Sequence, residues 1–447
     1  MSLFRGALRR RSLLGAGTGL GLAALAGCGA GSGGAPDLAR AAEVPRGEAT
    51  VRWWSFPMAT NDGDDLRRLL VEAFRSRHPN ITVTTVDAPA VTDISRSVLS
   101  TAVASGAASP DLYMGDVAWP SQFAHNALAL PLDAVVGEEY WRAYPESLVH
   151  ALGYGDDTYA FPFFADQAYL FYRRDLLDRH GLDVPASWEE LTAAARTVQR
   201  AGDAEYGLVF QGAVYEGLTA NVAEFVADAG GEILNAEGTR VTLGGRSGER
   251  ALTFLRDLVA DGVTPRAVGT FREQDSTDAF VGGRAVFLRN WAYVWGVVEA
   301  PDSPVAGRVG VVPRPGFEGA AGSGNGCLGG WCNFVNPHSE NPGAAVAFAR
   351  FCAEEEAQVI MVRNTAYLPA LSAVRAGVEA RRSPTPVTAL ADEVRLVPRP
   401  TRSPHYPQVS KALYTEVNTV LSGGASPTEA LERARAGIAD ALEGNAL

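Results

Sequence analysis

Lysine is almost missing from this chain: Lys411 is the only one among 447 residues, so arginine supplies nearly all of the positive charge. The net charge is −12, and the sequence has no long basic run. Nucleic acids and anionic lipid surfaces attract basic proteins, so this composition argues against both as partners. With 47% hydrophobic and 20% charged residues, the composition is that of a globular protein, and the length is enough for two domains.

Cysteine is also scarce, with four residues in all. Cys28 lies near the N-terminus, which leaves Cys327, Cys332 and Cys352, an odd number that allows one disulfide at most. Cys332 can pair with Cys352 if a strand near 332 packs on the helix that contains 352. No His/Cys spacing fits a zinc site, and we expect neither a metal nor another cofactor.

Residues 1–27 have the features of an export signal. The run RRRSLL at 9–14 is a twin-arginine-like start, and the apolar segment after it is too short to span a bilayer. LAGC at 25–28 resembles the bacterial lipobox, which would make Cys28 the acylated N-terminus of the mature protein. A Gly/Ala/Ser/Pro-rich stretch follows, and we interpret residues 28–47 as a flexible tether. The alternative is a cleaved signal with a chance cysteine.

Strand-like and helix-like segments alternate from residue 48 onward. EATVRWWSF, NITVTTVDA and PDLYMGD predict strands, and helices are expected between them over 64–78 and 93–105. This order predicts a parallel sheet with right-handed crossovers, in which ligands lie beyond the carboxyl ends of the strands. The pattern restarts after residue 165, where Ser187 and Ser426 open helices with capping boxes. We therefore expect two α/β lobes of similar size.

One acid stands in a strongly apolar stretch, FPFFADQAYLFYRRDLL at residues 161–177. Burying the carboxylate of Asp166 without a partner would cost several kcal/mol. Asp166 therefore either reaches solvent or binds something. The aromatic residues before it are typical of a strand.

Several segments follow one another in a distinctive order: the lipobox, EAFRSRHPNITV, PDLYMGDVAWPSQFAHNALALPLD, YAFPFFADQAYLFYRRDLLDRHGLDVPASWEEL, FVGGRAVFLRNWAYVWG and LGGWCNFVNPHSENPGAAVAFARF. In this order they resemble the family 1 extracellular solute-binding proteins, the carbohydrate-binding components of ABC importers. The resemblance covers almost the whole chain after Cys28. QGAVYEGLTANVAEF, RNWAYVWG, LGGW and VPRPTRSPHYPQVS are similar to the trehalose/maltose-binding branch of that family.

The resemblance implies an α/β fold of the periplasmic-binding-protein type, with two lobes as in maltose-binding protein and a hinge that the chain crosses three times. The crossings would lie near residues 164–166, 328–332 and 368–371. One lobe would comprise residues 48–164 plus 332–369, and the other residues 165–330 plus 371–447.

The resemblance also implies a sugar site. The matching positions are Asp62, Asp116, Phe164, Asp166, Trp291, Gly330, Trp331 and Arg399. Carboxylates and arginine form strong hydrogen bonds with hydroxyls, and indole rings cover the C–H faces of a sugar. Two positions depart from the branch, because Phe164 stands where relatives have a tyrosine and Ala292 replaces a proline.

Each of these residues also has a structural interpretation. Asp62 and Asp116 could cap helices, and the two tryptophans could belong to the core. Arg399 could form a surface ion pair. Outside this set, Glu216 is a weaker candidate that could be an internal polar partner, and Tyr293 could only pack.

The implied function is that of a monomeric receptor, anchored by lipid to the outer face of the cell membrane. It would capture a trehalose- or maltose-type disaccharide and deliver it to the permease subunits of an ABC transporter by hinge closure. The alternatives are a protein of the same fold for another oligosaccharide or a glycosylated metabolite, and, with less support, a glycoside hydrolase. Nothing in the sequence places two acids around a scissile bond, so we do not expect an enzyme.

Overall fold

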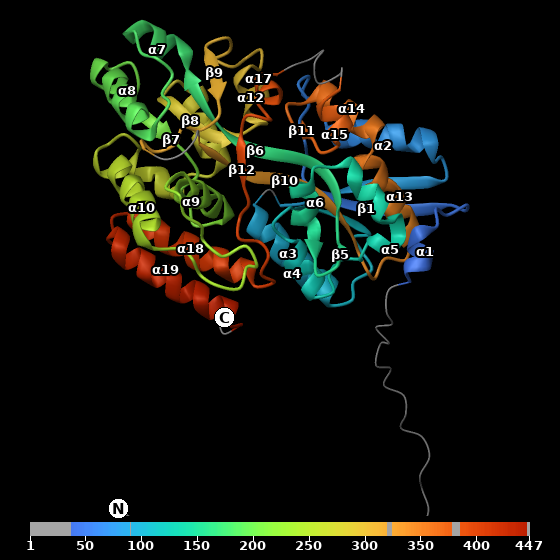
Figure 1. The fold of residues 1–447 in the computed structure, drawn as a ribbon. Coiled ribbons are helices and arrows are strands. Elements are labelled where there is room, and N and C mark those ends of the chain that lie inside the picture. The colour runs from blue at the N-terminus through green and yellow to red at the C-terminus, as the bar shows by residue number, and fades with distance from the viewer. Residues whose placement is uncertain (1–36, 90, 320–323, 378–384, 445–447) are drawn as a thin grey trace, which may run out of the picture. The chain divides into compact units, whose positions relative to one another are not determined.

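A computed structural model describes residues 37–89, 91–319, 324–377 and 385–444. Within them a ten-stranded sheet has the order β2-β1-β3-β10-β6-β8-β7, with β9 and β11 paired to β6 and β12 paired to β10 (Figure 1). The strands are β1 (Ala49–Ser55), β2 (Ile81–Asp87), β3 (Leu112–Asp116), β6 (Phe161–Arg173), β7 (Tyr206–Val209), β8 (Ala285–Trp291), β9 (Val309–Val312), β10 (Asn325–Val335), β11 (Leu368–Pro369) and β12 (Arg395–Val397), and β4 (Gly153–Tyr154) and β5 (Asp157–Thr158) form a separate pair.

The buried side chains fall into two groups, which define two lobes. One core draws mainly on residues 41–164 and 332–374. Its helices are α1 (Leu38–Ala42), α2 (Leu66–Arg77), α3 (Thr92–Ala104), α4 (Pro120–His125), α5 (Asp133–Val136), the 3-10 helix η1 (Glu138–Ala143), α6 (Glu146–Leu152), α13 (Pro342–Ala353), α14 (Glu355–Asn364) and α15 (Ser372–Arg375). We call this part the first lobe.

The second lobe has two clusters of buried residues, drawn mainly from residues 165–317 and 387–441. Along β6, Leu170 belongs to one cluster while Tyr169 and Phe171 belong to the other, because successive side chains point to opposite faces of the sheet. The helices of this lobe are α7 (Arg174–His180), α8 (Trp188–Ala201), α9 (Glu216–Asp228), α10 (Gly245–Ala260), the 3-10 helix η2 (Arg266–Thr270), α11 (Glu273–Val281), α12 (Val294–Val298), α17 (Pro386–Ala389), α18 (Tyr406–Leu421) and α19 (Pro427–Leu442).

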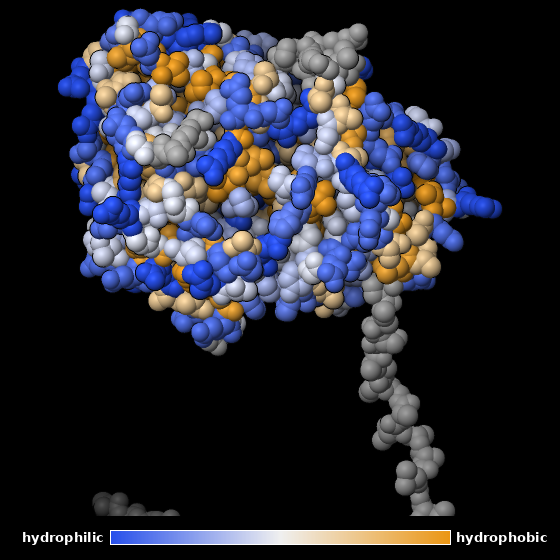
Figure 2. All heavy atoms as spheres, viewed as in Figure 1, coloured by the Kyte–Doolittle hydropathy of each residue, from blue (hydrophilic) through white to orange (hydrophobic). Residues whose placement is uncertain are grey.

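Two long strands run from one lobe into the other. Phe164 of β6 packs in the core of the first lobe, and the next residue, Ala165, packs in the second. The antiparallel strand β10 pairs with β3 through Trp331 and with β6 through Leu328. Figure 2 shows that most of this face of the molecule is hydrophilic. Apolar residues are visible in its middle, where the two lobes meet.

The first part of the sheet has the parallel pairing expected from the sequence. β1 lies between β2 and β3, and both pairs are parallel. β10 adds an antiparallel neighbour to β3, which local patterns do not reveal because the two strands lie more than 200 residues apart. Ser426 opens α19 with the predicted capping box. Ser187 caps α8, but the box is incomplete there, because the side chain of Glu190 accepts from the N–H of Ala186 instead of that of Ser187.

Two local predictions are corrected by the structure. The helix expected over 64–78 is α2, but its N-terminus is capped by the side chain of Asp65, which accepts from the N–H of Arg67. The predicted tether does not extend to residue 47, because residues 38–42 form α1, in which Ala41 is buried. The export signal, the lipobox and residues 28–36 lie outside the described residues.

The disulfide considered from the sequence is absent. Cys327, Cys332 and Cys352 are all free thiols and all buried. Burial raises the pKa of each thiol, that of Cys327 to about 12. These cysteines therefore pack as small apolar side chains and remain protonated at neutral pH.

Gly330 occupies a point where the crossing strands approach each other closely. Its φ is +127°, and a Cβ on it would lie 2.5 Å from the carbonyl oxygen of Phe164. We expect Gly330→Ala to lower the free energy of unfolding by about 2–4 kcal/mol, because it combines backbone strain with a steric clash. Urea unfolding would measure the loss.

A matched variant separates the two contributions. Gly63 also has a positive φ, +81°, but a Cβ on this residue would meet no other atom within 4 Å. Gly63→Ala should therefore cost only about 1 kcal/mol. Equal losses in the two variants would contradict the clash at Gly330.

Candidate functional site

A cavity of about 450 Å³ lies where β6 and β10 pass between the lobes. Its volume is typical of a small-molecule site. Both lobes contribute to its lining: Phe56, Val91, Thr92, Asp116 and Tyr367 from the first, Tyr215, Glu216, Gly217, Ala220, Arg272, Glu273, Gln274, Trp291, Tyr293 and Arg399 from the second or its loops, and Phe164, Asp166, Gly329, Gly330 and Trp331 from the two crossing strands. Seven of the eight predicted ligand positions thus share one cavity.

Among the eight predicted ligand positions, Asp62 is the one that lies outside the cavity. It is exposed in the turn before α2 and does not line the cavity. It does not cap α2 either, since Asp65 does so. The sequence pattern placed an acid near this helix start, but the fold directs a different part of the first lobe, the end of β3, toward the cavity.

Asp166 lies at the cavity wall on β6. Its Oδ1 accepts hydrogen bonds from the N–H groups of Gln167 at 2.8 Å and Ala292 at 3.0 Å. Among the described residues, none donates to Oδ2 and no cation forms an ion pair with the carboxylate. Asp166 is only 8% exposed, and burial raises its pKa to about 7, although the two N–H groups and the charge of Arg289 act in the opposite direction.

Arg399 joins acids from the two lobes. Its Nη1 and Nη2 bind the carboxylate of Asp116 at 3.1 and 2.5 Å, and Nη1 also donates to Glu216 Oε1 at 2.8 Å. Tyr406 and Ser410 donate to Glu216 as well, the latter at 2.6 Å. Burial raises the pKa of Glu216, while Arg399 lowers it. The arginine is thus buried rather than part of a surface ion pair, and Glu216 is an internal polar partner that also reaches the cavity.

Asp116 does not cap a helix, since the N-cap position of α4 is Trp119. Besides binding Arg399, its Oδ1 accepts from the N–H of Ala118 at 2.8 Å in the turn after β3. It also lines the cavity, so its carboxylate is already oriented by two partners before any ligand arrives.

Two half-buried indoles line the cavity. Trp331 packs edge-on against Phe56, with ring centroids 4.7 Å apart. Trp291 lies against the backbone of Gly329, where a Cβ would come within 2.8 Å of its ring. The glycine therefore makes room for the indole. Neither tryptophan is a core residue, since both reach the cavity.

Several lining residues were missed in the sequence. Glu273 and Arg272 come from the start of α11, where the hydroxyl of Tyr215 donates to Glu273 Oε2 at 2.6 Å. Tyr367 stacks on Phe164 with a centroid distance of 4.4 Å. Their common signal, a polar or aromatic residue next to the end of an element, is too frequent in the chain to single them out. Tyr293, considered only for packing, lines the cavity too.

The described part of the chain holds no group of three or more His, Cys, Asp or Glu side chains that could bind a metal ion. No helix in the same residues is long and apolar enough to cross a membrane. The charged and aromatic side chains that line the cavity are carboxylates, arginines and aromatic rings.

Several known proteins are similar to this chain in sequence or in structure. A probable ABC transporter-binding protein of Deinococcus radiodurans is 29% identical over 360 residues, which are 78% of this chain and 84% of that protein. The maltose-bound structure of T. maritima MalE3 has a TM-score of 0.80 and 29% identity, covering 89% of this chain and 99% of the other. A tagatose-bound solute-binding protein of Thermotoga lettingae has a TM-score of 0.79 at 23% identity, covering 88% and 100%.

These likenesses define the fold as the mixed α/β, two-lobed periplasmic binding protein fold, similar to MalE. The family model described as bacterial extracellular solute-binding protein matches residues 59–359, more than half of the chain. Members of this family bind solutes and are not enzymes. The two lobes, the cavity between them and this match lead to one conclusion: the chain belongs to the bacterial extracellular solute-binding protein family.

Proposed function

We propose that this protein captures a sugar in the cavity between its lobes and delivers it to the permease of an ABC transporter, with a trehalose- or maltose-type disaccharide as its ligand. The observation that carries the proposal is the composition of the cavity. Carboxylates and an arginine converge there with two indole faces in about 450 Å³. Each sugar hydroxyl needs hydrogen-bond partners to leave water, and its C–H faces need flat apolar cover.

The individual groups suit this task. Asp166 has Oδ2 left to accept from a hydroxyl, and hydrogen bonds to charged groups contribute about 1.5–3 kcal/mol each. Asp116 and Arg399 hold each other in place, so little side-chain entropy is lost when they contact a ligand. Trp291 and Trp331 offer ring surface, and maltose is the ligand named for T. maritima MalE3.

Capture would proceed by closure of the lobes around the ligand. Contacts between the lobes support this step: the carboxylate of Asp93, on α3 of the first lobe, accepts from the N–H of Glu216, on α9 of the second, at 3.0 Å. The Asp116–Arg399 pair also bridges β3 and the loop after β12. A ligand that touches both lobes favours this arrangement because only there are all of its contacts made.

The boundaries and the anchor belong to the same proposal. We place one lobe at residues 48–164 plus 332–369 and the other at 165–330 plus 371–447. The division of the buried cores supports most of this, but Ala41, Leu371 and Val374 pack in the core of the first lobe. Cys28 would carry the lipid that holds a monomeric receptor on the outer face of the cell membrane. The lipobox-like LAGC sequence supports this part.

A thermal-shift panel tests the ligand class. A ligand at a hundred times its Kd stabilises the folded protein by about 2.7 kcal/mol, which raises the melting temperature by a few degrees. We expect maltose or trehalose at millimolar concentration to produce such a shift, and a ketohexose and a polyol to produce smaller ones. Calorimetry would then give the Kd. No shift with any of the sugars would contradict the proposal.

A larger carbohydrate is the second candidate. Another cavity, of about 780 Å³, lies between the lobes beside the segment 395–402, and Arg399 lines both cavities. Space on both sides of one arginine supports a longer oligosaccharide or a glycosylated metabolite. In the panel, maltotriose and longer maltodextrins would then give the largest shift.

A further inference from the structure

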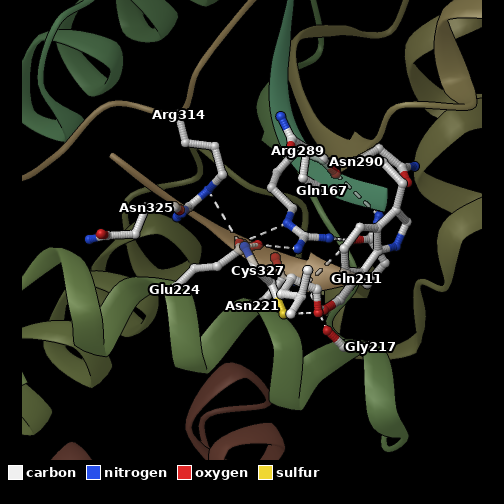
Figure 3. Close-up of polar contacts among 12 residues, drawn as sticks. Gln167, Gln211, Gly217, Asn221, Glu224, Arg289, Asn290, Arg314, Asn325 and Cys327 are labelled. Atoms are coloured by element: carbon white, nitrogen blue, oxygen red, sulfur yellow. Dashed lines mark hydrogen bonds and ion pairs between the residues drawn. The ribbon is translucent and has the colours of Figure 1, made fainter. Parts of the chain in front are cut away.

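A buried ionic network lies in the second lobe, and Figure 3 shows three of its charged side chains, Glu224, Arg289 and Arg314. Its four charged residues are Glu224 and Asp228 on α9, Arg289 on β8 and Arg314 after β9, and none is more than 3% exposed. Arg289 Nε donates to Glu224 Oε2 at 2.8 Å, and Arg314 Nε lies 3.2 Å from the same oxygen. Arg314 Nη2 lies 3.0 Å from Asp228 Oδ2. Two cations and two anions make the network neutral.

The network touches the cavity through Trp291. Arg289 and Trp291 are two residues apart on β8 and therefore share one face of the strand. The guanidinium carbon of Arg289 lies 4.4 Å from the centroid of the indole, the geometry of a cation–π contact. The indole is thus supported by Arg289 and by the backbone of Gly329, and it still lines the cavity.

The same network holds β10, one of the crossing strands. The N–H of Cys327 donates to Glu224 Oε1 at 2.9 Å. Two residues earlier, the N–H of Asn325 donates to Asp228 Oδ1 at 2.9 Å. The carboxylate of Glu224 therefore connects the guanidinium beneath Trp291 with the strand that passes between the lobes.

Stability alone is a weak reason for such a network. Well-packed apolar side chains of similar volume are often as stable as a buried ion pair, because desolvation offsets most of the Coulombic gain. The Arg289–Glu224 ion pair instead fixes the orientation of the guanidinium. Glu224 and the amide oxygen of Gln211, which accepts from Arg289 Nη1 at 2.8 Å, fix the plane of the guanidinium against the indole.

We propose that Arg289 is a positioning residue for ligand binding: its guanidinium, fixed by Glu224 and Gln211, holds the Trp291 indole against β10 with a face available to the ligand. This inference rests on the proposed function, in which the ligand packs on Trp291. It predicts that the loss of Arg289 weakens binding through the indole and leaves the fold intact.

The test is a paired substitution, Arg289→Met with Glu224→Gln. It removes one charge of each sign, keeps the side-chain volumes and leaves no buried charge without a partner. We expect the Kd for maltose, or for the sugar that the thermal-shift panel selects, to rise at least tenfold while the unfolding transition stays cooperative. Arg314→Met with Asp228→Asn is the matched control: it removes the same charges without touching Trp291, and its Kd should stay within twofold of wild type.

A double-mutant cycle shows whether the effect passes through the indole. In a Trp291→Ala background, the Arg289/Glu224 substitution should change the Kd by less than twofold. An equal loss in the wild-type and Trp291→Ala backgrounds would overturn the proposal, as would an unchanged Kd in the wild-type background.

A ligand-free measurement keeps the two proposals distinguishable. The Arg289/Glu224 substitution should increase acrylamide quenching of tryptophan fluorescence in the wild-type background and should leave it unchanged in a Trp291→Phe background. Unchanged quenching in both would overturn the positioning role. If wild type binds no sugar, the proposed function fails, but this comparison still tests Arg289. The quenching comparison also tests the role of Arg289 if the Trp291→Ala variant binds sugar too weakly for its Kd to be measured.

Discussion

Asp166→Asn should stabilise the ligand-free protein at pH 8 and weaken sugar binding at the same time. The folded-state pKa of Asp166 is raised to about 7, above the value of about 3.9 expected in the unfolded chain. Above pH 7 the folded protein therefore contains a buried charge, and ionisation of Asp166 opposes folding by up to roughly 4 kcal/mol. Asparagine removes that charge and keeps an oxygen for the N–H groups of Gln167 and Ala292.

The sign of the pH dependence follows from these pKa values. Between about pH 7 and pH 4 the folded wild type binds a proton that the unfolded chain does not, so its stability rises as the pH falls. The advantage of the Asn variant should therefore shrink by about 1.4 kcal/mol per pH unit over this range. Denaturant unfolding at pH 8, 6 and 4.5 would measure it.

Binding should change in the opposite direction. Sugar hydroxyls donate to the ionised carboxylate, so the Asn variant should lose at least a factor of 100 in affinity at pH 8. Wild-type affinity should itself decrease by up to tenfold per pH unit below 7, whereas that of the variant should not. Asp62→Asn, an exposed acid outside the cavity, is the matched control and should alter neither property. If Asp166→Asn bound sugar as wild type does, Asp166 would have only a structural role.

Arg399→Met should destabilise the fold by about 3–5 kcal/mol and abolish measurable sugar binding. The substitution leaves Asp116 and Glu216 buried without their shared cation, and breaking a buried pair in this way is costly. It also releases the carboxylate of Asp116 from its bidentate partner at the cavity. Urea unfolding and calorimetry with maltose would measure the two losses.

A second substitution separates stability from binding in this case. Arg399→Met combined with Glu216→Gln removes one charge of each sign and should recover part of the stability, because Asp116 is then the one carboxylate of this cluster left without its cation. Sugar binding should remain lost, because the cavity still lacks the guanidinium. Recovery of both properties would show that Arg399 acts only as a structural partner.

Much of the fold was predictable because its signals are local. The strands β1, β2 and β3 alternate or run apolar over short stretches, and Ser187 and Ser426 mark helix starts by capping. The tether prediction was wrong in its last residues because α1 is held by packing rather than by its own five residues. Such a short helix leaves little trace in composition.

Seven of the eight positions predicted from the sequence line the cavity, but the contacts among them were not predictable. Asp116, Asp166, Trp291 and Arg399 all reach the cavity. Arg399 binds Asp116, 283 positions away in the chain, and Asp166 accepts from the N–H of Ala292, 126 positions away. No local pattern records such a contact.

The sequence by itself determined the alternation of strands and helices, the family resemblance and the types of side chain available to a ligand, since these depend on neighbouring residues and on motif order. Only the tertiary structure decided that Asp62 stays outside the cavity, that Gly329 makes room for an indole, and that Glu224, 65 positions away, binds Arg289 beneath Trp291. The physical reason is that these outcomes depend on strand register and on the packing of segments far apart in the chain. Asp166 combines both levels: the sequence marks it as an acid in an apolar strand, and the fold places that strand at the wall of the cavity.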